Sequence, residues 1–218
     1  MLEIRYVWEW PVRITHWLNV ISIVVLSATG FYIGAPFAQV PSTSQFVMGW
    51  VRVVHFSFAY LFAISVLTRL IWAFFGNHHA SWRAFFPLLF KEGRRNAWQM
   101  FRYYTFTGRQ ISYEVGHNAL AATAYSGVMI LFLLQIVTGF ALYSQFAPGG
   151  LLAGIFGPLN ATVGVQWLRL THHLIMWLLI GFAIHHVYSA WLMDVKERNG
   201  TMASIFGGYK FVEPRDLK

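Results

Sequence analysis

Cysteine is absent from the 218-residue sequence, and charged residues make up only 11% of it. The absence of cysteine excludes disulfides, thiolate metal sites, iron–sulfur clusters bound by this chain and covalent c-type haem attachment. A soluble domain carries about 25% charged residues, so the low charge content argues against that class. No Asp, Glu, Lys or Arg occurs in residues 14–51, 115–168 or 170–193. Because a membrane-spanning helix needs roughly 20 apolar residues, the sequence predicts a multi-span membrane protein.

The predicted fold is an all-α, integral membrane four-helix bundle that forms a single domain of residues 1–218. Its spans cover about 14–33, 46–75, 118–143 and 163–193. Residues 76–117 are polar, basic and aromatic and are expected to form a loop with short interfacial helices. Pro148-Gly-Gly and Gly157-Pro are expected to break the chain between the last two spans. Glu3 and Glu9 precede the first apolar run, so no cleavable signal peptide is expected and the first span would direct insertion.

The distribution of Lys and Arg predicts the orientation. The N-terminal arm carries two of them, loop 76–117 carries six and the tail 194–218 carries five. The two other loops offer Arg169 and, if it lies outside, Arg52. The positive-inside rule therefore places both termini, loop 76–117 and the tail in the cytoplasm. We interpret the net charge of +8 as this topology, and expect the partner surface to be lipid and not nucleic acid.

Histidines are the ionisable side chains that recur within the predicted spans, where such groups are costly and usually functional. A lone histidine in a span can simply be hydrogen-bonded to a neighbouring helix. Six of the nine, however, lie in spans or at their edges: His16, His55, His172, His173, His185 and His186.

Depth and helical azimuth select four of these histidines as two pairs. His172 and His186 are fourteen residues apart, which leaves them ~40° apart in azimuth and ~21 Å apart along the helix axis. His173 and His185 differ by ~120° and form a poorer single-face pair. His55 lies at the predicted outer depth of His172, and His16 lies at the inner depth of His186.

Two facing neutral imidazoles are what a six-coordinate haem iron needs between helices, so the sequence predicts two haem b groups. His55 and His172 would ligate an outer haem, and His16 and His186 an inner one. Zinc would need further ligands that the spans do not supply, and proton relays generally include Asp or Glu, which the spans lack. A histidine-lined proton or metal transporter is the alternative from another class, and it predicts a colourless protein.

Arginines and glycines near these histidines are candidate supports for the haems. Arg13, Arg52 and Arg169 each precede a predicted ligand by three residues, so each shares its helical face and could pair with a haem propionate. Snorkelling to the membrane interface explains them equally well. Glycines within the spans would let a macrocycle approach the backbone, although small residues also serve helix packing; these are Gly30, Gly127, Gly139 and Gly181.

The sequence resembles the b-type cytochrome subunits of membrane-bound [NiFe] hydrogenases along nearly its whole length. The two most specific motifs, both histidine-bearing, are RITHWL (13–18), which continues to ATG (28–30), and RLTHHLIMW (169–177), which continues to His186. Further matches lie in MGWVRVVH (48–55), IWAFFGN (71–77), GHN (116–118) and TGFALY (138–143). Ala28 stands where a larger aliphatic residue is common in the family.

The resemblance implies an electron-transfer subunit without hydrogenase catalysis of its own. The family's four haem ligands correspond to His16, His55, His172 and His186. The implied partners are the iron–sulfur small subunit of a periplasmic [NiFe] hydrogenase and, through it, the large subunit. Electrons would pass from the small subunit to the outer haem, the inner haem and then menaquinone or ubiquinone. The implied location is the bacterial inner (cytoplasmic) membrane.

The resemblance also implies a quinone site near His117 and Asn118. In related formate dehydrogenase cytochromes, a quinone-analogue site adjoins the inner haem, and its key asparagine resembles Asn118. Capping of the third span is the alternative role for both residues. A cytochrome b subunit of formate dehydrogenase and a stand-alone di-haem quinol oxidoreductase remain alternative functions for the whole chain.

Overall fold

A computed structural model describes residues 2–37, 46–109, 115–146 and 148–212. The contacts divide the chain into two compact units. The first unit comprises Met1–Thr15, Thr68–Ile130 and Ala183–Lys218, and the second comprises His16–Leu67 and Leu131–Phe182.

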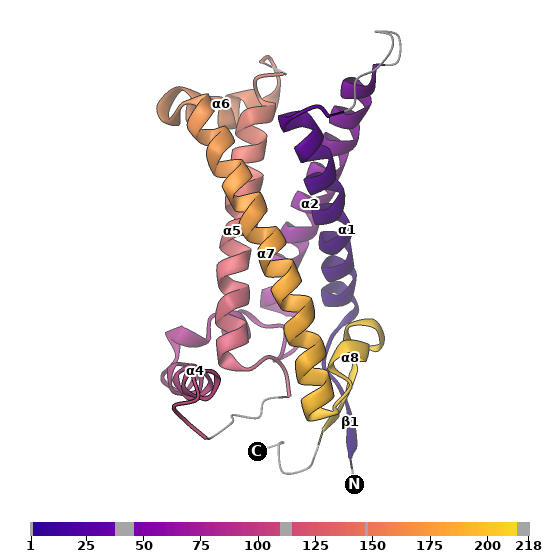
Figure 1. Ribbon diagram of the computed structural model, residues 1–218, viewed down its shortest axis with the longest axis vertical. Coiled ribbons are helices and arrows are strands. Elements are labelled where there is room, and N and C mark those ends of the chain that lie inside the picture. The colour runs from indigo at the N-terminus through magenta and orange to yellow at the C-terminus, as the bar shows by residue number, and fades with distance from the viewer. Residues whose placement is uncertain (1, 38–45, 110–114, 147, 213–218) are drawn as a thin grey trace. The chain divides into compact units, whose positions relative to one another are not determined.

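Four helices within the described residues are long and apolar enough to cross a membrane. They are α1 (Trp10–Gly34), α2 (Val47–Phe75), α5 (Ala119–Tyr143) and α7 (Val165–Glu197) (Figure 1). These helices confirm the predicted all-α membrane fold. α1 begins four residues before the predicted span, with Pro11 in its first turn, where proline is favoured. α7 continues past the apolar stretch to Glu197, because loss of apolarity ends a membrane span without ending a helix.

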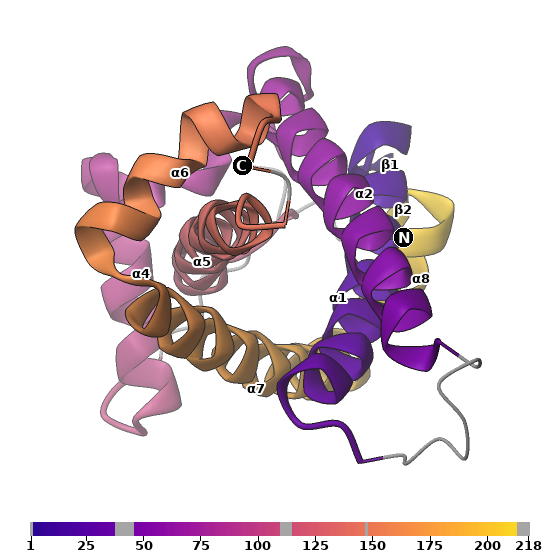
Figure 2. The ribbon, with the colours of Figure 1, turned by 90° about the horizontal axis from the view of Figure 1, so that it is seen from above.

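The expected break at Gly157-Pro is wrong. Helix α6 (Leu151–Val163) runs through Pro158, since an internal proline removes one hydrogen bond and bends a helix without always ending it. The chain turns instead at Gly164, whose φ of 86° favours glycine. Within the second unit, Asn160 connects α6 to the end of α5, because its amide donates to the Ala141 carbonyl at 2.8 Å. Figure 2 shows the ribbons of these two helices from above.

The first unit contains a small sheet that the sequence analysis did not predict. Strand β1 (Glu3–Tyr6) pairs antiparallel with β2 (Tyr209–Val212) in the register Glu3↔Val212 to Tyr6↔Tyr209. The short helix α8 (Thr201–Gly207) leads into β2. Two four-residue strands carry little periodicity of their own, so their pairing is visible only in the fold.

Short helices occupy the segment between α2 and α5, as expected. They are α3 (Trp82–Phe85), a 3₁₀ turn at Pro87–Leu89 and α4 (Lys91–Tyr104). The end of α2 is fixed to the N-terminal arm, because Glu9 accepts hydrogen bonds from the Trp72 indole and the Asn77 backbone, each at 2.8 Å. Residues of the N-terminal arm also form most of a buried apolar cluster in this unit; it comprises Val7, Trp8, Val12 and Ala80.

Candidate functional site

His55, in the second unit, is held by a threonine of α1. The Thr29 hydroxyl donates to the Val25 carbonyl at 2.7 Å and lies 2.8 Å from His55 Nδ1. Because a hydroxyl has one proton, already donated to the helix, its oxygen accepts from His55 and Nδ1 carries the hydrogen. The lone pair of this neutral imidazole is therefore on Nε2, where a metal can bind.

His172 has the same arrangement with α5. The Thr138 hydroxyl donates to the Leu134 carbonyl at 2.8 Å and lies 2.9 Å from His172 Nδ1. His172 Nε2 lies 3.2 Å from the Gln135 amide nitrogen, which donates to that lone pair. The Gln135 carbonyl oxygen is buried and has no hydrogen-bond partner among the described residues. The N–H of the Gln135 amide therefore already faces the Nε2 lone pair of His172.

A glycine follows each of these threonines and lies against the same imidazole. A Cβ built on Gly30 would lie 3.5 Å from His55 Cε1, and one built on Gly139 would lie 3.1 Å from His172 Cε1. The dipeptides Thr29-Gly30 and Thr138-Gly139 therefore hold the two rings in the same way. The threonine hydroxyl selects the Nδ1–H tautomer, and the glycine, which has no side chain, leaves room for the edge of the ring.

The two predicted inner ligands fall in different units. His186 belongs to the first unit, where its Nδ1 lies 3.2 Å from the Tyr125 hydroxyl. His16 belongs to the second unit, where its ring meets Trp17 edge-on at 5.2 Å between centroids. Their pairing stays a prediction.

His117 lies in the first unit, in an aromatic series that reaches a predicted haem ligand. Its ring centroid is 4.6 Å from that of Trp8 and 4.5 Å from that of Tyr125. Tyr125 in turn contacts His186, with centroids 5.5 Å apart. Asn118 caps α5, since its side-chain oxygen accepts from the Ala121 backbone at 2.9 Å.

The three candidate propionate partners differ in how their guanidinium groups are used. Arg13 is buried and donates to the Phe206 carbonyl. Arg52 lies 5.0 Å from the Phe146 ring centroid, and its Nε is buried without a hydrogen-bond partner among the described residues. Arg169 is exposed. The Nε of Arg13 is likewise buried without a partner among the described residues, but one of its guanidinium nitrogens is already used by Phe206. Arg52 is the candidate that shares the second unit with His55.

The other two span histidines bond within their own helix. His173 Nδ1 donates to the Arg169 carbonyl at 2.8 Å, and His185 Nε2 lies 3.2 Å from the Ser189 hydroxyl. The contacts of Thr29, Thr138 and Gln135 with these histidines were not expected from the sequence. The signal that could have found the threonines is the Thr-Gly dipeptide, which occurs in both the ATG and TGFALY segments.

The fold and these histidines define a class: a multi-span helical membrane protein whose half-buried imidazoles are donors of the kind that a b-type cytochrome offers to haem. The sequence comparison agrees. Residues 7–208 match the prokaryotic cytochrome b561 family, and the chain belongs to that family.

The curated relatives are similar over nearly their full length. The chain is 38% identical to a probable Ni/Fe-hydrogenase B-type cytochrome subunit of Cupriavidus necator over 214 residues, which cover 96% of this chain and 88% of the relative. The protein of the same name from Bradyrhizobium diazoefficiens is 38% identical over 93% of this chain and 84% of its own length. A probable Ni/Fe-hydrogenase 1 B-type cytochrome subunit of Escherichia coli K12 is 35% identical, over 94% and 90% respectively.

Haem b, the prosthetic group of a b-type cytochrome, fits the residues of the second unit. His55 and His172 both have the Nδ1–H tautomer, whose Nε2 lone pair can bind iron, and a hydrogen bond from Nδ1–H to a fixed acceptor normally orients a ligating histidine. Iron binding at His172 Nε2 would replace the hydrogen bond that this atom accepts from the Gln135 amide. Arg52, whose Nε is buried without a partner among the described residues, would offer a cation to a propionate.

Proposed function

We propose that this chain is the di-haem cytochrome b subunit of a Ni/Fe hydrogenase, in which it anchors the enzyme and carries electrons. The names of the curated relatives support the hydrogenase assignment. The observation that carries the electron-transfer role is the matched holding of His55 and His172 by Thr29 and Thr138. Dihydrogen would be oxidised in the partner and not in this chain.

The proposed ligand pairs are His55 with His172 for an outer haem and His16 with His186 for an inner haem. Bound haem b supplies a reversible one-electron carrier. Electrons from the iron–sulfur small subunit would enter at the outer pair and leave from the inner pair to the quinone pool. Arg13, Arg52 and Arg169 are proposed propionate partners, and Arg52 is the best supported of them.

The proposed location is the bacterial inner membrane, with both termini, loop 76–117 and the tail 194–218 on the cytoplasmic side. The Lys and Arg distribution supports this orientation. The pairing of β1 with β2 adds a second argument. Two strands that exchange hydrogen bonds lie on the same side of a membrane, so the two ends of the chain would lie on one side, as an even number of spans requires.

The proposed site of quinone reduction lies beside His117 and Asn118. The contacts from His117 through Tyr125 to His186 support it, because they connect this surface to a proposed inner-haem ligand. The cap that Asn118 provides uses its carbonyl oxygen, and its side-chain amide interacts with the Tyr104 hydroxyl. The amide has two hydrogens, so the second could be donated to a quinone oxygen. Menaquinone and ubiquinone both present such an oxygen.

Haem stoichiometry and co-purification test this function together. The purified chain should contain two haem b groups, both low-spin, and acid-acetone should extract all of the haem because no cysteine is present to hold it. A tagged chain isolated from mild detergent should bring a Ni/Fe hydrogenase with it. One haem per fully loaded chain would contradict the two-pair assignment, and a colourless protein would favour the transporter alternative.

A further inference from the structure

Helix α4 of the first unit combines clustered basic residues with exposed aromatic side chains. The segment 91–109 contains five basic residues and one acidic residue. Ala97 and Met100 are buried, but Trp98 and Phe101 are exposed and stack at 5.5 Å between centroids. A basic helix that exposes aromatic side chains is suited to the surface of an anionic membrane.

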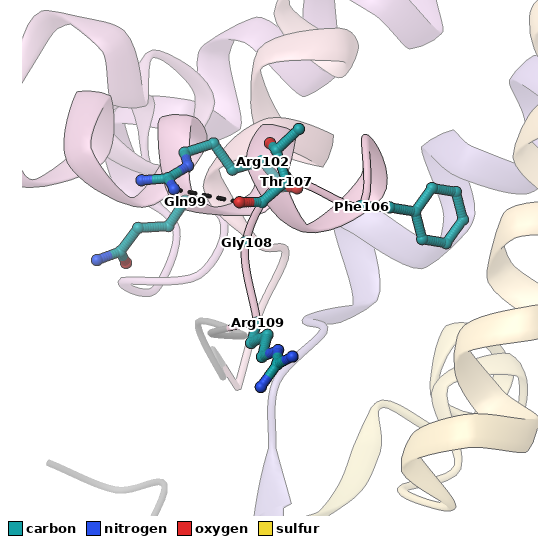
Figure 3. Close-up of a pocket in the computed structure, with 6 residues that line it drawn as sticks. All are labelled: Gln99, Arg102, Phe106, Thr107, Gly108 and Arg109. Atoms are coloured by element: carbon teal, nitrogen blue, oxygen red, sulfur yellow. Dashed lines mark hydrogen bonds between the residues drawn. The ribbon is translucent and has the colours of Figure 1, made fainter.

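The C-terminal end of α4 borders a surface hollow of about 560 Å³. Figure 3 shows its lining residues: Gln99, Arg102, Phe106, Thr107, Gly108 and Arg109. The backbone turns back here, because the Thr107 and Gly108 amides both donate to the Arg102 carbonyl, at 2.9 and 3.0 Å. One guanidinium nitrogen of Arg102 donates to the Thr107 carbonyl at 3.1 Å. This bond positions an exposed guanidinium at the hollow with further N–H groups to donate.

Phe106 follows the C-cap of α4 and projects from this turn. Its φ of 60° lies in the left-handed region, which is usual at this position of a helix end but favours glycine over a residue with a Cβ. The Phe106 amide donates to the Tyr103 carbonyl at 3.1 Å, and the Thr107 amide donates to the Arg102 carbonyl at 2.9 Å. This cap explains the backbone conformation but not the phenylalanine, whose side chain is 96% exposed and gains no packing within the described residues.

We propose that the hollow and Phe106 form a binding site for an anionic phospholipid. Arg102 and Arg109 would bind the headgroup phosphate, since guanidinium groups match its oxygens. Phe106 would enter the interfacial layer beside the glycerol backbone, where aromatic rings are favoured. Trp98 and Phe101 would lie in the same layer along α4. The site depends on the membrane location of the chain but not on its haems or on the quinone.

Lipid titration of the purified full-length protein, followed by native mass spectrometry, tests the site. Phosphatidylglycerol should bind more tightly than phosphatidylcholine. The Arg102→Gln/Arg109→Gln variant should lose about 30-fold in phosphatidylglycerol affinity, because each basic residue near an anionic surface contributes about fivefold. The matched control is Arg83→Gln/Lys196→Gln, which removes two exposed charges outside the hollow and should bind like the wild type.

The Phe106→Gly variant separates lipid contact from folding. Glycine relieves the left-handed strain, so the thermal midpoint in lipid-free detergent should stay level or rise, while phosphatidylglycerol affinity should fall several-fold. A lower midpoint would overturn the role of Phe106, because it would mean that the ring packs within the chain. Equal affinity in the arginine variant and its control would overturn the site. Displacement of the lipid by millimolar inorganic phosphate would also overturn it, because it would identify a site for free phosphate.

Discussion

The Thr138→Val variant is the sharpest test of how the proposed ligands of the outer haem are held. Valine replaces the hydroxyl with a methyl group of similar size, so the substitution removes the acceptor for His172 Nδ1–H and leaves no cavity. Thr138 is 5% exposed, so water cannot easily take the place of the lost oxygen. The substitution also removes what selects the Nδ1–H tautomer, on which iron binding at Nε2 depends.

The size of the effect follows from the cost of an unpaired buried donor. Leaving such a group unsatisfied costs about 1–3 kcal/mol, and loss of a partner to a ligating histidine typically lowers metal affinity about 10- to 100-fold. We therefore expect the outer haem to dissociate about 10- to 100-fold faster. The inner haem should be unaffected, because Thr138 contacts neither His16 nor His186 in any described hydrogen bond.

The assay is transfer of haem from the purified chain to apomyoglobin, followed by absorbance. The matched control is Thr123→Val in the same helix, since Thr123 donates to the Ala119 carbonyl at 2.7 Å and has no described bond to a histidine. Thr138→Ser should restore slow haem loss. Equal rates of haem loss in the Thr138→Val and Thr123→Val variants would refute the proposed role of the hydroxyl.

Four further predictions address ligation, topology and stability. His55→Ala should remove the outer haem and abolish quinone reduction, while hydrogen oxidation with a soluble dye that takes electrons directly from the partner survives; normal quinone reduction would rule out the transmembrane route. His172→Ala should lose haem, whereas His173→Ala should keep both haems, since the latter ring bonds to its own helix; visible spectra that show the reverse would make the azimuth argument wrong. A reporter active only in the cytoplasm should be active at the C-terminus and silent at Pro148, and the opposite pattern would exchange the inner and outer assignments. Burial lowers the pKa of Lys210 from its ordinary 10.5, so the unfolded chain binds more protons and the folded chain gains stability as pH rises toward 10.5; thermal melts of Lys210→Met should lack this rise.

The sequence by itself determined the class of protein and the positions of its spans. Runs of about 20 apolar residues without charge leave few folds other than membrane helices, because an unpaired backbone group cannot be buried in lipid. The sequence also predicts a common depth for His55 and His172, since helix rise is constant along a span. Such properties depend on residues close together in the chain.

The tertiary structure alone decided how those histidines are held. The bond from His55 to Thr29 joins residues 26 positions apart, and that from His172 to Thr138 joins residues 34 apart. Azimuth on an isolated helix cannot say which side chain of another helix will meet a ring. The Thr-Gly dipeptide can be recognised as a recurring motif only after the fold has shown that each copy contacts a histidine ring.

For the chain ends and for α6, too, the sequence predicted one part of the arrangement and the fold alone showed the rest. Charge counting assigned both termini to one side, but the pairing of Glu3 with Val212 appeared only in the fold. The Gly157-Pro158 dipeptide predicted a break, yet α6 continues to Val163 and turns at Gly164. A local propensity is a small free energy, and packing such as the bond from Asn160 to Ala141 can outweigh it. Composition therefore determined which segments are apolar enough to cross a membrane, and long-range contacts determined the geometry that orients the proposed haem ligands.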